Sequence, residues 1–145
     1  MDQETKDRVR ASWAEVAQLG PLAAEVFYKQ LFEQEPRLKH VFAGVDMVRQ
    51  HSRLVDALSF VVDRLDRLDE VVPVLEELGR RHQGYGVGER DYEAVGAALL
   101  ATLEEAHGDA WTRPLASSWE AAYGFVAGTM QSATMQSVQC NRPTG

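Results

Sequence analysis

The chain is poor in cysteine, and its only one, Cys140, lies near the C-terminal end. A single thiol excludes an intrachain disulfide and a cysteine metal cluster. The start of the chain, MDQETKDRVR, lacks the apolar core of a secretory signal. The longest mostly apolar stretch, AVGAALLATL at 94–103, is far shorter than the roughly 20 residues that span a bilayer. We therefore expect a cytoplasmic protein that has no membrane partner.

Basic residues are also in short supply, because 15 lysines and arginines stand against 22 aspartates and glutamates and give a formal net charge of −7. Such a chain has no broad basic surface for a phosphate backbone, so we expect no nucleic-acid partner. With 145 residues, 45% of them hydrophobic, it is long enough for one domain with a substantial core. We place this domain at 1–133 and expect a polar, flexible tail at 134–145.

Alternating strand patterns are absent, whereas apolar side chains recur at helical spacing along most of the chain. For example, Val71, Leu75 and Leu78 fall on one stripe. Glycine and proline punctuate the stripes, as Gly20 and Pro21 do. The pattern does not choose between an up-down bundle and the obliquely packed globin arrangement. It predicts an all-α chain of six or seven amphipathic helices, among them 5–18, 21–35, 46–65, 70–81 and a long helix that ends near residue 108.

Three polar residues interrupt otherwise apolar helix faces, and they are Tyr28, Gln50 and His82. Gln50 lies one helical turn before Leu54, and His82 follows Leu78 at the same spacing. Taken alone, His82 could be a cation near a helix end, a satisfied core residue or a metal ligand. If the helices converge, the three polar side chains enclose a cavity with one metal-binding nitrogen opposite two hydrogen-bonding groups.

Five motifs occur in order along the chain, and they are FYKQLFEQEPRLKHVF, DMVRQHSRLVDAL, LGRRHQGYGV, DYEAVGAALLATLEEAHGDAWT and WEAAYGFVA. They resemble the motifs of the single-domain bacterial globins related to the flavohaemoglobins. The likeness covers about residues 5–133 and depends on the order and spacing of the motifs, because a lone arginine-histidine pair is common by chance. The resemblance implies a globin fold, with six to seven helices packed obliquely around a pocket for haem b.

The resemblance also implies roles for single residues. His82 matches the proximal iron ligand, and Phe42 matches a phenylalanine that packs on the haem. Tyr28 and Gln50 match the distal pair that faces bound gases, and Leu54 matches the apolar residue beside them. Haem is a flat apolar disc, so it needs an apolar slot as well as one axial base. The residues expected to line this slot are Phe42, Leu54, Leu58, Leu78, Val87 and Val95.

The proximal side departs from the family in one respect. In the flavohaemoglobin relatives a tyrosine and a glutamate hydrogen-bond the proximal histidine, and Tyr92 matches the tyrosine. The glutamate position falls at or near Thr134, and no acidic residue lies between Tyr123 and the end of the sequence. We therefore expect a weaker push of electron density onto the iron and less peroxidase-like chemistry.

The family resemblance implies that oxygen, nitric oxide and carbon monoxide bind at an iron that can be five-coordinate. Oxygen binding or carriage and nitric oxide dioxygenation would use the same site. Because 145 residues leave no room for flavin and nicotinamide domains, a dioxygenase role would need an external reductase. Two other hypotheses remain: a haem-based gas sensor, disfavoured because no output domain follows, and a haemless helical interaction protein.

The remaining polar residues near the motifs receive weaker roles. His51 follows Gln50 by one residue, about 100° around the helix, so it is expected to point beside the pocket. The resting ferric iron is then expected to have water or a vacant position as its sixth ligand. Arg80 and Arg81 are most simply a solvated helix end that complements the helix dipole, and either could instead reach a haem propionate, as Arg53 could. We expect solvated surface positions for His40 and His107, and core positions for Trp13, Trp119 and Tyr123.

Overall fold

The computed structural model describes the backbone of residues 1–140 and the side chains of residues 1–134. This part contains six α-helices, two 3-10 helices and no strand, which confirms the predicted all-α class. None of the described helices combines the length and the apolar character needed to cross a membrane. In chain order the elements are α1 (Gln3–Ala17), α2 (Pro21–Gln34), η1 (Pro36–His40), α3 (Met47–Asp63), α4 (Leu68–Gly84), α5 (Glu89–His107), η2 (Gly108–Ala110) and α6 (Arg113–Cys140).

Polar side chains and a proline begin several of these helices. Asp2 accepts the backbone N–H of Thr5 at 2.8 Å before α1, and Asp46 accepts that of Val48 at 3.1 Å before α3. Pro21 occupies the first turn of α2, where its missing N–H leaves no hydrogen bond unmade. Because these signals are local, the predicted starts of α2 and α3 agree closely with the observed ones.

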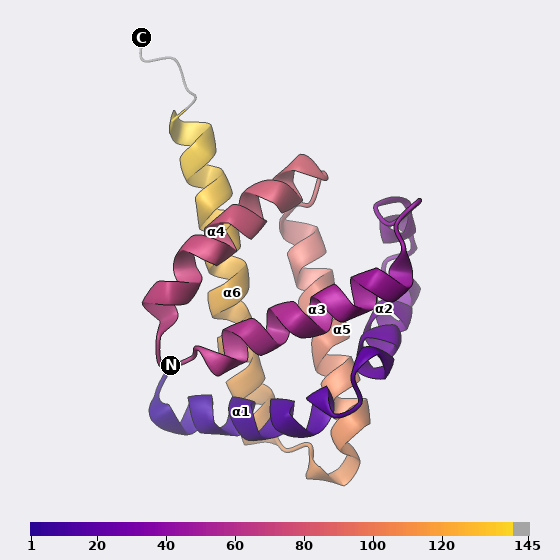
Figure 1. The fold of residues 1–145 in the computed structure, drawn as a ribbon, viewed down its shortest axis with the longest axis vertical. Helices are drawn as coiled ribbons and strands as arrows, with labels where there is room; N and C mark the ends of the chain where they lie inside the picture. Colours follow the sequence, from indigo (N-terminus) through magenta and orange to yellow (C-terminus); the bar gives the residue numbers. More distant parts are fainter. Residues whose placement is uncertain (141–145) are drawn as a thin grey trace.

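The helices cross at oblique angles and do not form an up-down bundle (Figure 1). α2 packs on α5 and α3, α1 packs on α6 and α3, and α4 packs on α6. Within the described residues, α3 and α4 are scarcely in contact, although both lie in front of α5 and α6 in Figure 1. The facing sides of α3 and α4 are therefore only partly covered by the chain. The core is formed by fully buried side chains such as those of Val9, Leu31, Leu65, Leu75 and Leu103.

The ends of α4 and α6 differ from the predicted ones. α4 continues past the predicted end at residue 81 to Gly84, so His82 lies inside its last turn. The chain turns away only at Gly86, whose φ of 82° is in the left-handed region that favours glycine. α6 continues to Cys140, beyond the predicted start of the tail at residue 134. Residues 141–145 lie outside the described part of the chain.

His107 is not the solvated residue predicted from the sequence. Its side chain is only 4% exposed, and its Nε2 lies 2.6 Å from the Ser12 hydroxyl oxygen. Its Nδ1 lies 3.4 Å from a carboxylate oxygen of Glu15, and its ring stacks on Trp111 at a centroid distance of 6.1 Å. The correction has a tertiary cause, because the end of α5 packs against α1, which is distant in sequence. Trp13 and Trp119 are buried as predicted, and Tyr123 is half-buried.

A glycine sets the close approach of α4 to α6. A Cβ built on Gly79 would lie 2.8 Å from both Cα and the carbonyl carbon of Met130, a distance that real Cβ atoms do not adopt. The obstacle is backbone, so a side chain there can be accommodated only if one helix moves. Because His82 is on α4 less than one turn further along, this contact helps to determine where the imidazole lies.

We expect Gly79→Ala to lower the free energy of unfolding by about 1–3 kcal/mol, because overpacking at a backbone contact costs about that much. Alanine also gains up to about 1 kcal/mol of helix propensity over glycine, so the net loss is smaller than the clash itself. Gly84→Ala is the matched control, since Gly84 lies in the same helix with open space around its Cβ position. Urea unfolding of both variants tests this, and equal midpoints would contradict it.

Candidate functional site

A buried tyrosine on α2 and a glutamine on α3 form one half of the site. The Tyr28 side chain is part of the buried core, with the residue only 5% exposed. The Gln50 amide nitrogen donates to the Tyr28 hydroxyl oxygen at 3.0 Å. The packing of α2 on α3 thus brings together two of the three polar residues singled out in the sequence.

This hydrogen bond leaves the proton of the Tyr28 hydroxyl available for another acceptor. A phenolic oxygen can accept one hydrogen bond and donate another. Burial raises the pKa of Tyr28 above its usual value of 10.0, against the opposing effect of the Gln50 hydrogen bond, so the hydroxyl remains a donor at neutral pH. The family resemblance implied that Tyr28 and Gln50 both face a bound gas, and the structure adds that the Gln50 amide is directed at Tyr28.

Aromatic rings surround Tyr28. The ring of Phe42 meets the Tyr28 ring edge to face at a centroid distance of 5.2 Å and also contacts Phe32 at 5.6 Å. The imidazole of His51 stacks on the Tyr28 ring at 5.4 Å with an angle of 23° between the planes. His51 and Phe42 are each half-buried. The tyrosine is therefore held both through its oxygen and through its ring.

The corner that carries Phe42 is anchored by an ion pair that sequence reasoning missed. The guanidinium of Arg37, in η1, contacts the carboxylate of Asp91, at the start of α5. Asp91 is 5% exposed and also accepts the backbone N–H of Gly88 at 2.9 Å. An acidic residue three places after a glycine is typical of a helix start, which is the only signal the sequence offered.

The other half of the site is His82, near the end of α4. Its Nδ1 lies 2.7 Å from the backbone carbonyl oxygen of Leu78, one turn earlier. A carbonyl oxygen only accepts, so the ring proton is on Nδ1 and the lone pair of Nε2 is available to a metal. The backbone N–H of Val87 donates to the His82 carbonyl at 3.0 Å and secures the corner after the helix. His82 thus has the tautomer that an axial ligand requires.

The apolar residues predicted to line a slot are partly uncovered. Each is half-buried and packs on one side against the core. Because each of these side chains is only partly covered, each leaves some apolar surface exposed. The set comprises Phe42, Leu54, Leu58, Leu78, Val87 and Val95.

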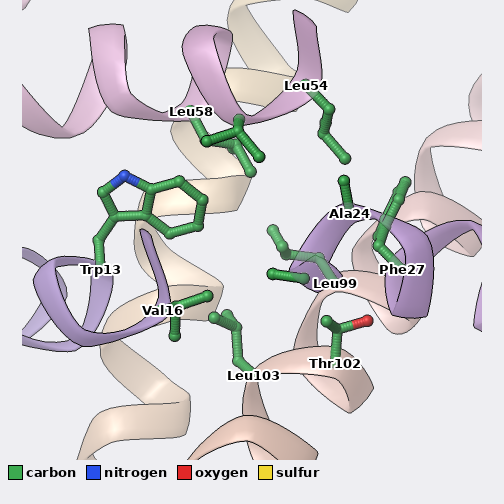
Figure 2. A pocket seen from close by; sticks show the side chains of 11 residues that line it. Trp13, Val16, Ala24, Phe27, Leu54, Leu58, Leu99, Thr102 and Leu103 are labelled. Carbon is green, nitrogen blue, oxygen red and sulfur yellow. The ribbon is translucent and has the colours of Figure 1, made fainter. Parts of the chain in front are cut away.

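Leu54 and Leu58 also face a small cavity on the core side of α3 (Figure 2). The cavity has a volume of about 20 Å³ and lies between α1, α2, α3 and α5. Its one hydroxyl, that of Thr102, donates to the Ala98 carbonyl at 2.7 Å, so no free polar group remains to hold water. Contact of Leu54 and Leu58 with a cofactor therefore stays a prediction, since their side chains point into this cavity in Figure 2.

Tyr92 is buried, yet its hydroxyl has no hydrogen-bond partner. Burial raises its pKa, so the hydroxyl stays protonated. It does not bond to His82, whose Nδ1 is already directed at Leu78. Position 134 carries a threonine and offers no carboxylate to His82, and the Thr134 hydroxyl donates at 2.7 Å to the Gln131 carbonyl of its own helix.

The three arginines considered as partners of the haem propionates are exposed. Arg80 and Arg81 pair with Glu77 on their own helix, at 3.2 and 3.4 Å. Arg53 is exposed on α3. All three stay candidates for carboxylate groups at the edge of a cofactor.

The side chains at this site suit a metal ion whose other ligands are supplied by a cofactor. Within the described residues no three histidine, cysteine, aspartate or glutamate side chains gather into a metal-binding group. The chain instead offers one imidazole nitrogen beside apolar surface. A haem brings four nitrogen ligands in a flat apolar ring, so one axial base and an apolar slot are what it requires. The residues present fit this group.

Comparisons with known proteins agree with this geometry. A family model described as Globin matches residues 25–130. The Flavohemoprotein of Rhizobium meliloti (strain 1021) is 33% identical over 129 residues, which cover 88% of this chain and 32% of the relative. The Flavohemoprotein of Vibrio cholerae serotype O1 is 30% identical over 88% of this chain and 33% of its own length. The Neuroglobin of Chaenocephalus aceratus is 26% identical over 90% of both chains. The chain thus spans about a third of the length of these two flavohemoproteins.

Proposed function

This chain belongs to the globin family, with haem b as its cofactor, and we propose that it binds oxygen tightly through a hydrogen-bond donor on α2. The observation that carries the proposal is the hydrogen bond from Gln50 to the oxygen of Tyr28, at 3.0 Å. That contact leaves the proton of the Tyr28 hydroxyl for a gas ligand. The haem supplies the iron at which small diatomic gases bind reversibly.

His82 is the residue that would hold the haem iron. Its Nδ1–H is held by the Leu78 carbonyl at 2.7 Å, which orients the ring and presents Nε2 as the coordinating atom. A neutral carbonyl acceptor draws the Nδ1 proton less strongly than a carboxylate would. The imidazole would therefore give the iron less electron density than one paired with a carboxylate, which favours reversible binding over chemistry that breaks the O–O bond.

Tyr28 is the proposed donor to the ligand. A hydroxyl in a buried position favours ligands with partial negative charge on their outer atom, as oxygen has, over the less polar carbon monoxide. Gln50 acts through Tyr28, because an oxygen that accepts a hydrogen bond becomes a stronger donor through its own proton. The raised pKa of Tyr28 keeps the proton in place across the neutral range.

We propose nitric oxide dioxygenation as a second role, because the family resemblance implies that it would use the same oxygen-binding site. Two relatives are named Flavohemoprotein, a name that joins a flavin with a haem, and this chain matches about a third of their length. In the balanced reaction, nitric oxide, oxygen and one electron give nitrate, so each turnover needs a one-electron reductant. We propose a separate flavin-dependent reductase as its source. The same distal tyrosine would retain oxygen until nitric oxide arrives.

We expect the reduced protein with oxygen to convert nitric oxide to nitrate once per haem, and to turn over repeatedly only when a flavin reductase and nicotinamide cofactor are supplied. The reason is that the iron is left oxidised after each reaction. Nitrate is measured with and without the reductase, and the reductase alone is the control. Reduction of the iron without repeated nitrate formation would leave oxygen binding as the only proposed role.

A further inference from the structure

His51 is a half-buried residue of α3 that the proposed function does not use. Its ring lies on the Tyr28 ring with a centroid distance of 5.4 Å and an interplanar angle of 23°, an offset stack. Within the described side chains, neither of its ring nitrogens makes a hydrogen bond or ion pair. The contact with Tyr28 is therefore the main interaction of this imidazole.

Two neighbouring residues of one helix thus hold Tyr28 at different places. Gln50 reaches the phenol oxygen at 3.0 Å, and His51 covers a face of the ring. They can do so because successive residues of a helix point about 100° apart. Phe42 supplies a third contact, edge to face at 5.2 Å. Without the stack, Tyr28 would keep its hydrogen bond but would lose support against rotation of the ring.

We propose that His51 is a positioning residue, whose flat ring keeps the Tyr28 hydroxyl directed at the gas ligand. The proposal rests on the proposed function, because it concerns the donor that retains oxygen. An aromatic pair of this kind changes the population of the held orientation by roughly twofold to tenfold. The stack requires a flat ring and not an imidazole nitrogen, which separates this role from proton transfer or iron coordination.

Three variants test the proposal. His51→Ala removes the ring, whereas His51→Phe keeps a flat ring without nitrogen. His40→Ala is the matched control, because His40 is an exposed histidine of η1. The measurements are oxygen release by stopped flow and the C–O stretching frequency of the carbon monoxide complex, which responds to the direction of a nearby donor.

We expect His51→Ala to speed oxygen release by roughly twofold to tenfold, in line with the lost stack, and to add a second C–O band. His51→Phe and His40→Ala should both match the parent protein. Release and C–O bands in His51→Ala that equal those of the parent would overturn the proposal. Equal changes of the oxygen release rate in His51→Ala and His51→Phe would also overturn the proposal. A low-spin bis-histidine ferric spectrum of the parent protein that disappears in both variants would do the same, because either result would assign the role to an imidazole nitrogen.

A fourth variant separates this inference from the function on which it rests. In a Tyr28→Phe background, His51→Ala should leave oxygen release unchanged, because the hydroxyl that it positions is gone. If Tyr28→Phe itself does not speed release, the proposed function fails. If Tyr28→Phe speeds release but His51→Ala does not, only the positioning role of His51 fails.

Discussion

His82→Ala should lose most of its haem during purification, while its helical content stays close to that of the parent protein. The reason is that His82 presents the only imidazole on α4, with Nδ1 held by the Leu78 carbonyl and Nε2 free to coordinate. The other three histidines lie outside α4. His40 is exposed in η1, His51 stacks on Tyr28 and the His107 side chain is buried beside α1. The ratio of haem absorbance to protein absorbance measures the loss.

Added imidazole should restore part of the haem binding to His82→Ala, because it can occupy the space of the missing ring and supply the same nitrogen. His40→Ala should keep its full complement of haem and serves as the control. Complete haem retention by His82→Ala with an unchanged ferrous spectrum would show that another residue holds the iron. Loss of helical circular dichroism would instead indicate that the variant fails to fold, and imidazole rescue would then be absent.

Tyr28→Phe should release oxygen roughly tenfold to a hundredfold faster than the parent protein, since a hydrogen bond to a charged acceptor contributes roughly 1.5–3 kcal/mol. The substitution removes only the hydroxyl and keeps the ring between Phe42 and His51. Carbon monoxide, which is less polar, should be affected much less. Stopped-flow measurement of both ligands distinguishes the loss of a donor from a general opening of the pocket.

Gln50→Leu should act in the same direction as Tyr28→Phe but more weakly, because the Gln50 amide is directed at the Tyr28 oxygen at 3.0 Å. The double variant should fall short of the summed effects, as expected for coupled residues. Tyr85→Phe is the matched control, because Tyr85 is 67% exposed at the corner after α4. Unchanged oxygen release in Tyr28→Phe would mean that its hydroxyl does not reach the ligand, and tight binding through Tyr28 would be abandoned.

Much of the fold and of the candidate site was readable from the sequence, because it depends on interactions close along the chain. The spacing of Val71, Leu75 and Leu78 predicts the buried stripe of α4 from helix geometry alone. Pro21 and Asp46 begin helices where they occur. A polar residue on an apolar stripe is conspicuous for the same reason, which is how Tyr28, Gln50 and His82 were singled out.

The partner that each polar side chain contacts depended on packing between elements distant in sequence, which helical periodicity does not encode. The family resemblance implied that Gln50 faces a ligand, and the packing of α2 on α3 adds a contact that the sequence did not indicate, from its amide to Tyr28. The same packing places His51 on the Tyr28 ring.

Packing between distant elements also determines the partners of two residues that the sequence did not distinguish. Asp91 resembles any acidic residue near a helix start, but its buried carboxylate is paired with Arg37, which lies 54 residues earlier and keeps an exposed side chain. His107 resembles a solvated helix end, and α1 buries it. Local spacing therefore determined which helices form and which faces are apolar. Tertiary contacts decided what each polar group on those faces touches, because a side chain's partners are set by the helices that pack against it.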